Sequence, residues 1–172
     1  MVKVVGGVRP LSRNGTAYQN RLEEYRGLMQ SDAYSTGYFS VEGGGYFLVE
    51  DSPAKHKTEE LEAAKHLADN GYKVILKNEA GSHNTVDGKV FNLTYEQRTP
   101  TKDAPTTIRN ALFHARDKWA DVAVIYSKGH AFTRESVEKG IKLYEDAVKD
   151  KRFEKIIVVA DNGHVHVHKH RK

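Results

Sequence analysis

The chain has 172 residues, of which 38% are hydrophobic and 29% are charged. This composition supplies one globular core, and no apolar run approaches the roughly 20 residues of a membrane-spanning helix. The absence of cysteine excludes disulfides, thiol catalysis and thiolate metal sites. The net charge of +4 indicates a polyanionic partner. No secretory signal is evident at the start, so we expect a cytoplasmic protein that contacts no membrane.

Residues 1–50 predict a basic arm rich in glycine and proline, a short helix and a hairpin. The helix is indicated by one apolar stripe, made of Tyr18, Leu22, Tyr25 and Met29. Two short apolar runs on either side of Gly43-Gly44-Gly45 predict the hairpin. We expect residues 51–172 to form an α/β domain that makes one compact unit with this N-terminal part.

The next segment predicts a helix and two strands. Apolar residues recur at helical spacing at Leu61, Ala64, Leu67 and Ala68, and Asn70-Gly71 is a typical helix end. A strand is expected over Tyr72–Leu76. Residues Val90–Arg98 alternate as one continuous strand, which places Glu96 and Arg98 on the same face.

The remaining residues alternate between helices and strands. Thr106 or Thr107 is the expected N-cap of a helix that reaches Trp119, and Thr133 is the expected N-cap of the next helix. Buried strands are predicted over Asp121–Tyr126 and Ile156–Ala160, and a turn at Asp161-Asn162-Gly163 returns the chain as a strand over His164–His168. This order predicts an α/β fold whose mixed sheet is covered by helices on both faces.

Several short motifs in this region resemble a known family. They are the Glu60, Ala64-Lys65 and Gly71-Tyr72 helix-to-strand pattern, Val86-Asp87, Glu96-Gln97-Arg98 and Thr106-Thr107-Ile108. The stretch from Glu59 to Val167 is similar to the C-terminal tRNA-nuclease domains of contact-dependent growth inhibition toxins. It is also similar to related nucleases of phages and mobile elements, which have a restriction-endonuclease-like core of the PD-(D/E)xK type.

The resemblance implies a nuclease that cleaves RNA, in particular tRNA, with a divalent cation such as Mg²⁺. It implies that Glu60, Asp87 and Glu96 gather the cation, with Asp87 and Glu96 as its ligands, and that Arg98 steadies the scissile phosphate. It also implies an immunity protein as a partner and delivery into a target cell. The sequence departs from the family at Arg98, because the family has lysine there and arginine cannot take a proton.

Further residues are candidates for nucleic-acid contact: Lys65, Thr106, Thr107, Lys128, His166 and His168. Phosphodiester cleavage requires stabilisation of extra negative charge, which carboxylate–metal–cation clusters provide. Simpler interpretations stay open. Glu96 and Arg98 can form an ion pair on an exposed strand, Asp87 can begin a turn, and Glu60 can be an ordinary first-turn acid.

A second cluster lies near the end of the chain. Strand alternation puts His164, His166 and His168 on one face, where three imidazoles can bind Zn²⁺. The same histidines can instead act as acid and base in a metal-independent RNase. A third alternative is a catalytically inactive relative that binds nucleic acid or another protein.

Overall fold

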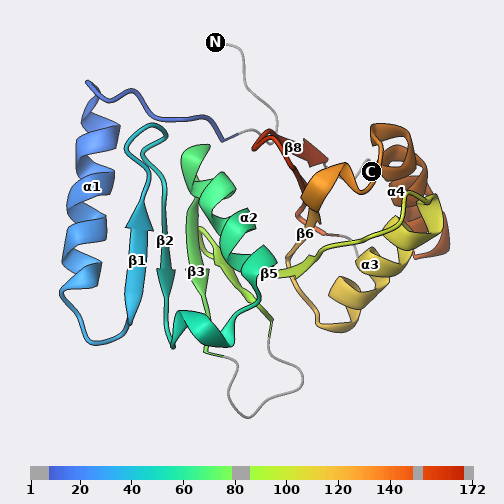
Figure 1. Ribbon diagram of the computed structural model, residues 1–172, viewed down its shortest axis with the longest axis horizontal. Helices are drawn as coiled ribbons and strands as arrows, with labels where there is room; N and C mark the ends of the chain where they lie inside the picture. Colours follow the sequence, from blue (N-terminus) through green and yellow to red (C-terminus); the bar gives the residue numbers. More distant parts are fainter. Residues whose placement is uncertain (1–7, 79–85, 149–152, 169–172) are drawn as a thin grey trace.

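The computed structural model describes residues 8–78, 86–148 and 153–168. These parts form a mixed eight-stranded sheet with helices on both faces (Figure 1), which confirms the predicted α/β class. The helices are α1 (Thr16–Met29), α2 (Thr58–Asp69), α3 (Pro105–Asp117) and α4 (Arg134–Ala147), with 3₁₀ turns η1 (Pro53–Lys55) and η2 (Lys128–His130). The strands are β1 (Thr36–Phe39), β2 (Tyr46–Val49), β3 (Lys73–Leu76), β4 (Gly88–Val90), β5 (Leu93–Arg98), β6 (Val122–Ser127), β7 (Lys155–Ala160) and β8 (Val165–His168).

Each strand lies beside its neighbour in the sequence, in the order β1 to β8. The pairs β2–β3, β5–β6 and β6–β7 are parallel, and the other pairs are antiparallel. It follows that β2, β3, β5, β6 and β7 run in one direction, so their carboxyl ends meet at one edge of the sheet. Because β2 pairs with β3, the N-terminal hairpin and the rest of the chain share this sheet.

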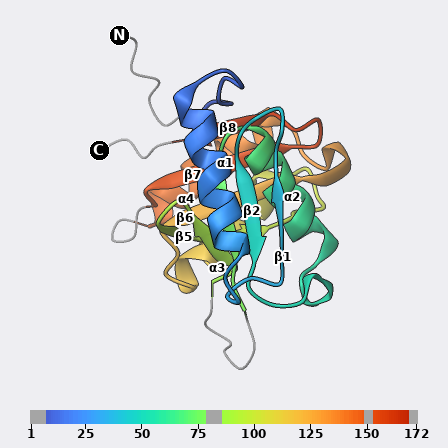
Figure 2. The same ribbon diagram turned by 90° about the vertical axis from the view of Figure 1, so that its left-hand side faces the viewer.

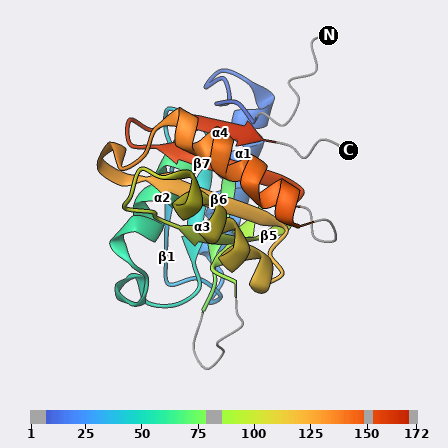
Figure 3. The same ribbon diagram turned by 90° about the vertical axis from the view of Figure 1, so that its right-hand side faces the viewer.

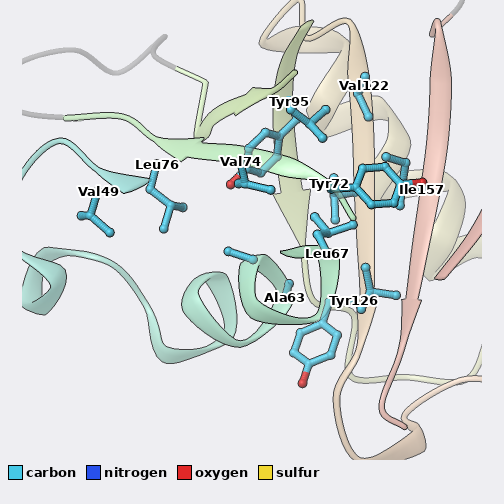
Figure 4. Close-up of a cluster of buried hydrophobic side chains, with 14 residues drawn as sticks. Val49, Ala63, Leu67, Tyr72, Val74, Leu76, Tyr95, Val122, Tyr126 and Ile157 are labelled. Carbon is cyan, nitrogen blue, oxygen red and sulfur yellow. The ribbon is translucent and has the colours of Figure 1, made fainter. Parts of the chain in front are cut away.

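The two faces of the sheet carry separate apolar clusters. One face packs against α2, and the buried cluster between them includes Leu67 of α2 together with Tyr72, Val74, Tyr95 and Ile157 (Figure 4). The opposite face packs against α3 and α4, which lie side by side in Figure 3. All residues of β6, which are apolar except for Ser127, are buried because the strand has one helix layer on each side.

Helix α1 covers the other end of the sheet, over β1 and β2 (Figure 2). Its predicted apolar stripe docks through aromatic rings, since Tyr18 meets Phe39 edge-on and Tyr25 lies against both Phe39 and Tyr46. Aromatic pairs of this kind contribute about 0.5–1.5 kcal/mol each beyond their buried area. None of the helices in the described ranges combines the length and the apolar character of a membrane-spanning helix.

The prediction of one continuous strand over Val90–Arg98 is wrong. The chain turns at Phe91 and Asn92, with Phe91 at φ 53°, and Val90 pairs with Leu93 across a two-residue hairpin. Paired residues of a hairpin share a face, so Val90 lies on the same face as Leu93, whereas a continuous strand would place these two residues on opposite faces. The sequence hides this change of phase, because Phe91 in the turn extends the apolar alternation of Leu93 and Tyr95 by one step. Within β5 the predicted faces hold, because Tyr95 and Gln97 pair with residues of the α2 side while Glu96 and Arg98 pair with Ala123 and Ile125.

The helix ends agree with the sequence in part. Gly71 adopts the left-handed conformation expected after α2, and Thr133 caps α4 by accepting the backbone N–H of Ser136. The expectation that Thr106 or Thr107 caps α3 is wrong, because Ala104 is the N-cap and the helix starts at Pro105. Proline suits the first helical position, since its missing N–H has no partner there.

Candidate functional site

A cavity of about 730 Å³ lies at the carboxyl end of β5, between the N-terminus of α2 and one face of α3. It gathers side chains from segments far apart in the sequence: Lys55, Lys57, Glu59, Glu60, Asp87, Glu96, Gln97, Arg98, Thr99, Pro100, Thr101, Thr107, Asn110, Ala111, His114 and Lys128. Carboxyl ends of parallel strands are the usual place for ligand sites in α/β sheets. The cavity contains the four residues expected to be catalytic.

Asp87 and Glu96 hold each other in place across the β4–β5 hairpin. The backbone N–H of Asp87 donates to Glu96 Oε1 over 3.2 Å, and the backbone N–H of Gln97 donates to Asp87 Oδ2 over 2.8 Å. Both carboxylates are buried, and each accepts a backbone N–H of the other strand end. The hairpin therefore fixes two oxygen-rich groups next to each other at the cavity.

Glu60 joins them from the first turn of α2. Its Oε2 accepts the backbone N–H of Lys57 over 2.8 Å, which caps the helix. Burial raises the pKa of Glu60, and Asp87 raises it further through its negative charge and a side-chain hydrogen bond. Glu96 lies on the α3 face of the sheet, whereas α2 covers the opposite face. The carboxylates can still meet because the cavity lies at the strand end.

Arg98 and His114 line the cavity beside Glu96. His114 Nε2 lies 3.2 Å from Glu96 Oε2 and 3.5 Å from Arg98 Nη1. Glu96 favours a proton on this ring, but burial lowers the pKa of His114, and the positive charges of Arg98 and Lys118 lower it further. Burial and Arg98 prevail, so the imidazole is neutral at neutral pH. The guanidinium can only donate, so Nε2 is the acceptor of that contact.

Three residues of the cavity, His114, Lys55 and Lys57, carry no signal in the sequence that singles them out. Thr107, Asn110 and His114 recur at helical spacing, a pattern that becomes meaningful only once this face of α3 is known to line a cavity. Lys55 and Lys57 are exposed residues in the segment that leads into α2. With Arg98 and Lys128 they place positive charges around the buried acids.

The predicted nucleic-acid contacts are dispersed. Thr107 and Lys128 line the cavity, and Lys128 also pairs with Glu62 at 3.2 Å and with Glu59 at 3.8 Å. Thr106 is exposed on α3 and is not among the lining residues. Lys65 lies elsewhere on α2, where it pairs with Asp69 at 3.3 Å and lies over the ring of Tyr38.

His166 and His168 line a second cavity, of about 430 Å³, with residues of α4 and β7. The register pairs them with Val158 and Ile156, so both lie on the face that α3 and α4 cover. Burial lowers the pKa of His168, and the charge of His166 lowers it further. His164 is exposed in the turn before β8.

The described ranges contain no group of three or more His, Cys, Asp or Glu side chains arranged to hold a metal ion. Mg²⁺ commonly takes one or two protein carboxylates and completes its shell with water and phosphate oxygens. Asp87 and Glu96 fit that demand, because they are neighbouring carboxylates at an open cavity. Burial is the main cause of the raised pKa of Glu60, and the negative charge of the nearby Asp87 adds to it.

No protein-family model and no curated protein sequence matches the chain. Among solved structures, the chain is similar to the CdiA-CT/CdiI toxin and immunity complex from Burkholderia pseudomallei. The TM-score is 0.47 and the identity is 17%, over 69% of this chain and 92% of that chain. A likeness this distant transfers neither fold nor activity from that protein to this chain.

Proposed function

We propose that the chain is a nuclease that cleaves RNA phosphodiester bonds with the help of a divalent cation. The observation that carries the proposal is the convergence of Glu60, Asp87 and Glu96 beside Arg98 in one open cavity. Structural ion pairs rarely concentrate buried acids in this way, because like charges at close range are unfavourable. Such clusters are typical of functional sites.

Each residue has a distinct role in this proposal. Asp87 and Glu96 are the groups that would hold Mg²⁺, which when bound supplies an activated water and neutralises charge on the phosphate. Arg98 is exposed, stays protonated and can donate two parallel hydrogen bonds to phosphate oxygens. Neutral His114 accepts from Arg98 through Nε2 and helps to orient the guanidinium, whereas the same unprotonated nitrogen cannot donate to Glu96.

The identity of the substrate rests on the sequence resemblance. RNA, and tRNA in particular, is the substrate that the resemblance to growth-inhibition toxin nucleases implies, and the net charge of +4 suits any nucleic acid. The same resemblance supports a role as a toxin delivered into target cells, by a bacterium or a mobile element, and neutralised by an immunity protein. These finer assignments belong to the proposal.

The decisive experiment compares cleavage of total tRNA by the purified chain with Mg²⁺ and with EDTA. We expect cleavage with Mg²⁺ only, and a loss of about 10²-fold or more in Asp87→Asn and Glu96→Gln, because each removes a charged group at the reacting centre. Glu138→Gln, on the exposed face of α4, is the matched control and keeps full activity.

Other outcomes identify the alternatives. Cleavage that survives EDTA and is lost in His166→Ala indicates a metal-independent RNase built on the second cavity. A salt-sensitive shift of RNA in a gel without any cleavage indicates a binding relative. Stoichiometric Zn²⁺ uptake that His166→Ala abolishes supports a metal site on the histidine strand.

A further inference from the structure

The segment between β2 and α2 buries a histidine behind the cavity. His56 follows η1, and its side chain is 1% exposed. Its Nε2 lies 2.6 Å from Oδ1 of Asp51, whose side chain is 6% exposed. Its Nδ1 lies 3.7 Å from Glu60 Oε2 and has no hydrogen-bond partner among the described residues. The imidazole is therefore enclosed between two carboxylates, one deep in the fold and one at the cavity.

Packing alone does not account for this arrangement. A buried nitrogen without a hydrogen bond destabilises the fold, and an apolar side chain of similar size would avoid that loss. The contact with Asp51 fixes the plane of the ring, because Nε2–H donates to that carboxylate. The ring then presents Nδ1 toward Glu60 and restricts where that carboxylate can lie.

Glu60 transmits this restriction to the proposed metal site. Glu60 lies close enough to Asp87 for that carboxylate to raise its pKa, and it accepts the backbone N–H of Lys57. Polar contacts thus run from Asp51 through His56 and Glu60 to Asp87, and the step from His56 to Glu60 is a 3.7 Å contact rather than a hydrogen bond. Asp51 and His56 are not among the residues that line the cavity, so neither would touch substrate directly.

We propose that Asp51 and His56 form a positioning pair that holds Glu60 against Asp87 for the reaction. The role of this pair in the reaction rests on the proposed nuclease function, but the contact of the pair with Glu60 can be tested without measuring cleavage. Residues that orient the groups around a metal typically change affinity or activity by about 10–100-fold when they are replaced.

Two amide variants separate positioning from packing. His56→Asn keeps an amide near the place of Nδ1, facing Glu60, whereas His56→Gln keeps one near the place of Nε2, facing Asp51. We expect both variants to fold, with kcat for tRNA reduced about 10–100-fold in His56→Gln, less in His56→Asn, and KM unchanged. His164→Gln, an exposed histidine at the other end of the sheet, is the control. Equal activity of His56→Gln and the unmodified chain overturns the proposal, as does a larger loss in His56→Asn.

A second measurement does not depend on cleavage. The ¹³C NMR signal of the Glu60 carboxyl group reports its surroundings, and we expect it to move in His56→Gln and Asp51→Asn but not in His164→Gln. If the unmodified chain cleaves no nucleic acid while this signal moves, the nuclease function fails and the positioning pair stands. An unmoved signal in both variants overturns the pair.

Discussion

At the scale of single residues, Glu60 is a cavity residue whose ionised side chain destabilises the folded chain. Its pKa is raised by burial first and then by Asp87, so ionised Glu60 is less stable in the folded chain than in the unfolded one. The favourable contribution of the protonated form is complete below the ordinary value of 4.5 and is lost as the pH rises through the raised pKa. At neutral pH, this side chain therefore reduces the free energy of unfolding.

Glu60→Gln removes that penalty and keeps an oxygen to accept the Lys57 N–H. We expect the free energy of unfolding at pH 7.5 to rise by up to about 1 kcal/mol while cleavage falls, as happens when strained functional residues are replaced. Thermal unfolding at pH 7.5 and at pH 4 measures the effect, which should vanish at the lower pH. A variant that is less stable than the unmodified chain at pH 7.5 would contradict this account.

The role of Arg98 can be tested with two variants, one that removes its positive charge and one that keeps the charge but changes the hydrogen-bonding geometry. We expect Arg98→Ala to lower kcat about 10²-fold, because the phosphate loses a fixed donor pair in the transition state. The kcat of Arg98→Lys should lie between that of the unmodified chain and that of Arg98→Ala, because lysine keeps the positive charge but loses the bidentate geometry. Arg134→Ala, at an exposed arginine of α4, serves as the control. Full activity of Arg98→Ala would remove Arg98 from the site.

At the scale of elements, the β4–β5 hairpin brings the acids together. Gly88 follows Asp87 and begins β4, and a Cβ atom there would collide with the carbonyl oxygen of Ile75 and the ring of Tyr95. The strand can approach β3 this closely only because residue 88 has no side chain. The position of Asp87 at the cavity depends on that approach.

We expect Gly88→Ala to destabilise the fold by about 1–3 kcal/mol, because the added methyl group forces β4 away from β3. Gly27→Ala is the matched control, since Gly27 lies in α1 and no atom of the described residues lies near its Cβ position. That control should stabilise the chain by roughly 0.5–1 kcal/mol, as alanine does in helices. Chemical denaturation of both variants measures these changes in the free energy of unfolding. A neutral effect of Gly88→Ala would show that the hairpin can shift freely.

At the scale of the whole molecule, charge is divided between a buried acidic centre and an exposed basic rim. Asp87 and Glu96 are buried, whereas Lys55, Lys57 and Arg98 are exposed at the same cavity. A nucleic acid can therefore meet positive charges before its backbone approaches the acids. Binding of this kind weakens with salt, because each neutralised phosphate releases counterions.

The exposed basic rim predicts that the RNA association constant depends measurably on salt concentration. In an Asp87→Asn background, which prevents cleavage, the logarithm of the RNA association constant should fall linearly with the logarithm of the salt concentration. Replacing Lys55 and Lys57 with alanine should make that slope shallower by about one for each phosphate that the protein no longer neutralises. The pair Lys139 and Lys142 on α4 provides the control. An unchanged slope in the Lys55 and Lys57 variant would place the nucleic acid elsewhere.

Local patterns in the sequence were sufficient to predict the helices, most strands and the mixed α/β class. The candidate acids came from the family resemblance, and their roles stay a prediction. Those predictions depend on periodicity, capping chemistry and a short motif, which act over a few neighbouring residues. The alternation also indicated that Glu96 and Arg98 share a face, since β5 is regular. It failed at Phe91, where the two-residue hairpin shifts the alternation by one residue and puts Val90 on the face of Leu93 instead of the opposite face.

Which polar groups meet depends instead on how the elements pack in three dimensions. His114 joins Glu96 because α3 packs beside β5, and His56 lies behind Glu60 because the β2–α2 segment folds inward. Lys65 shares a motif with Glu60 yet pairs with Asp69, away from the cavity. Contacts between distant segments arise from the packing of whole elements, and the local periodicity that reveals each element carries no information about its neighbours in space.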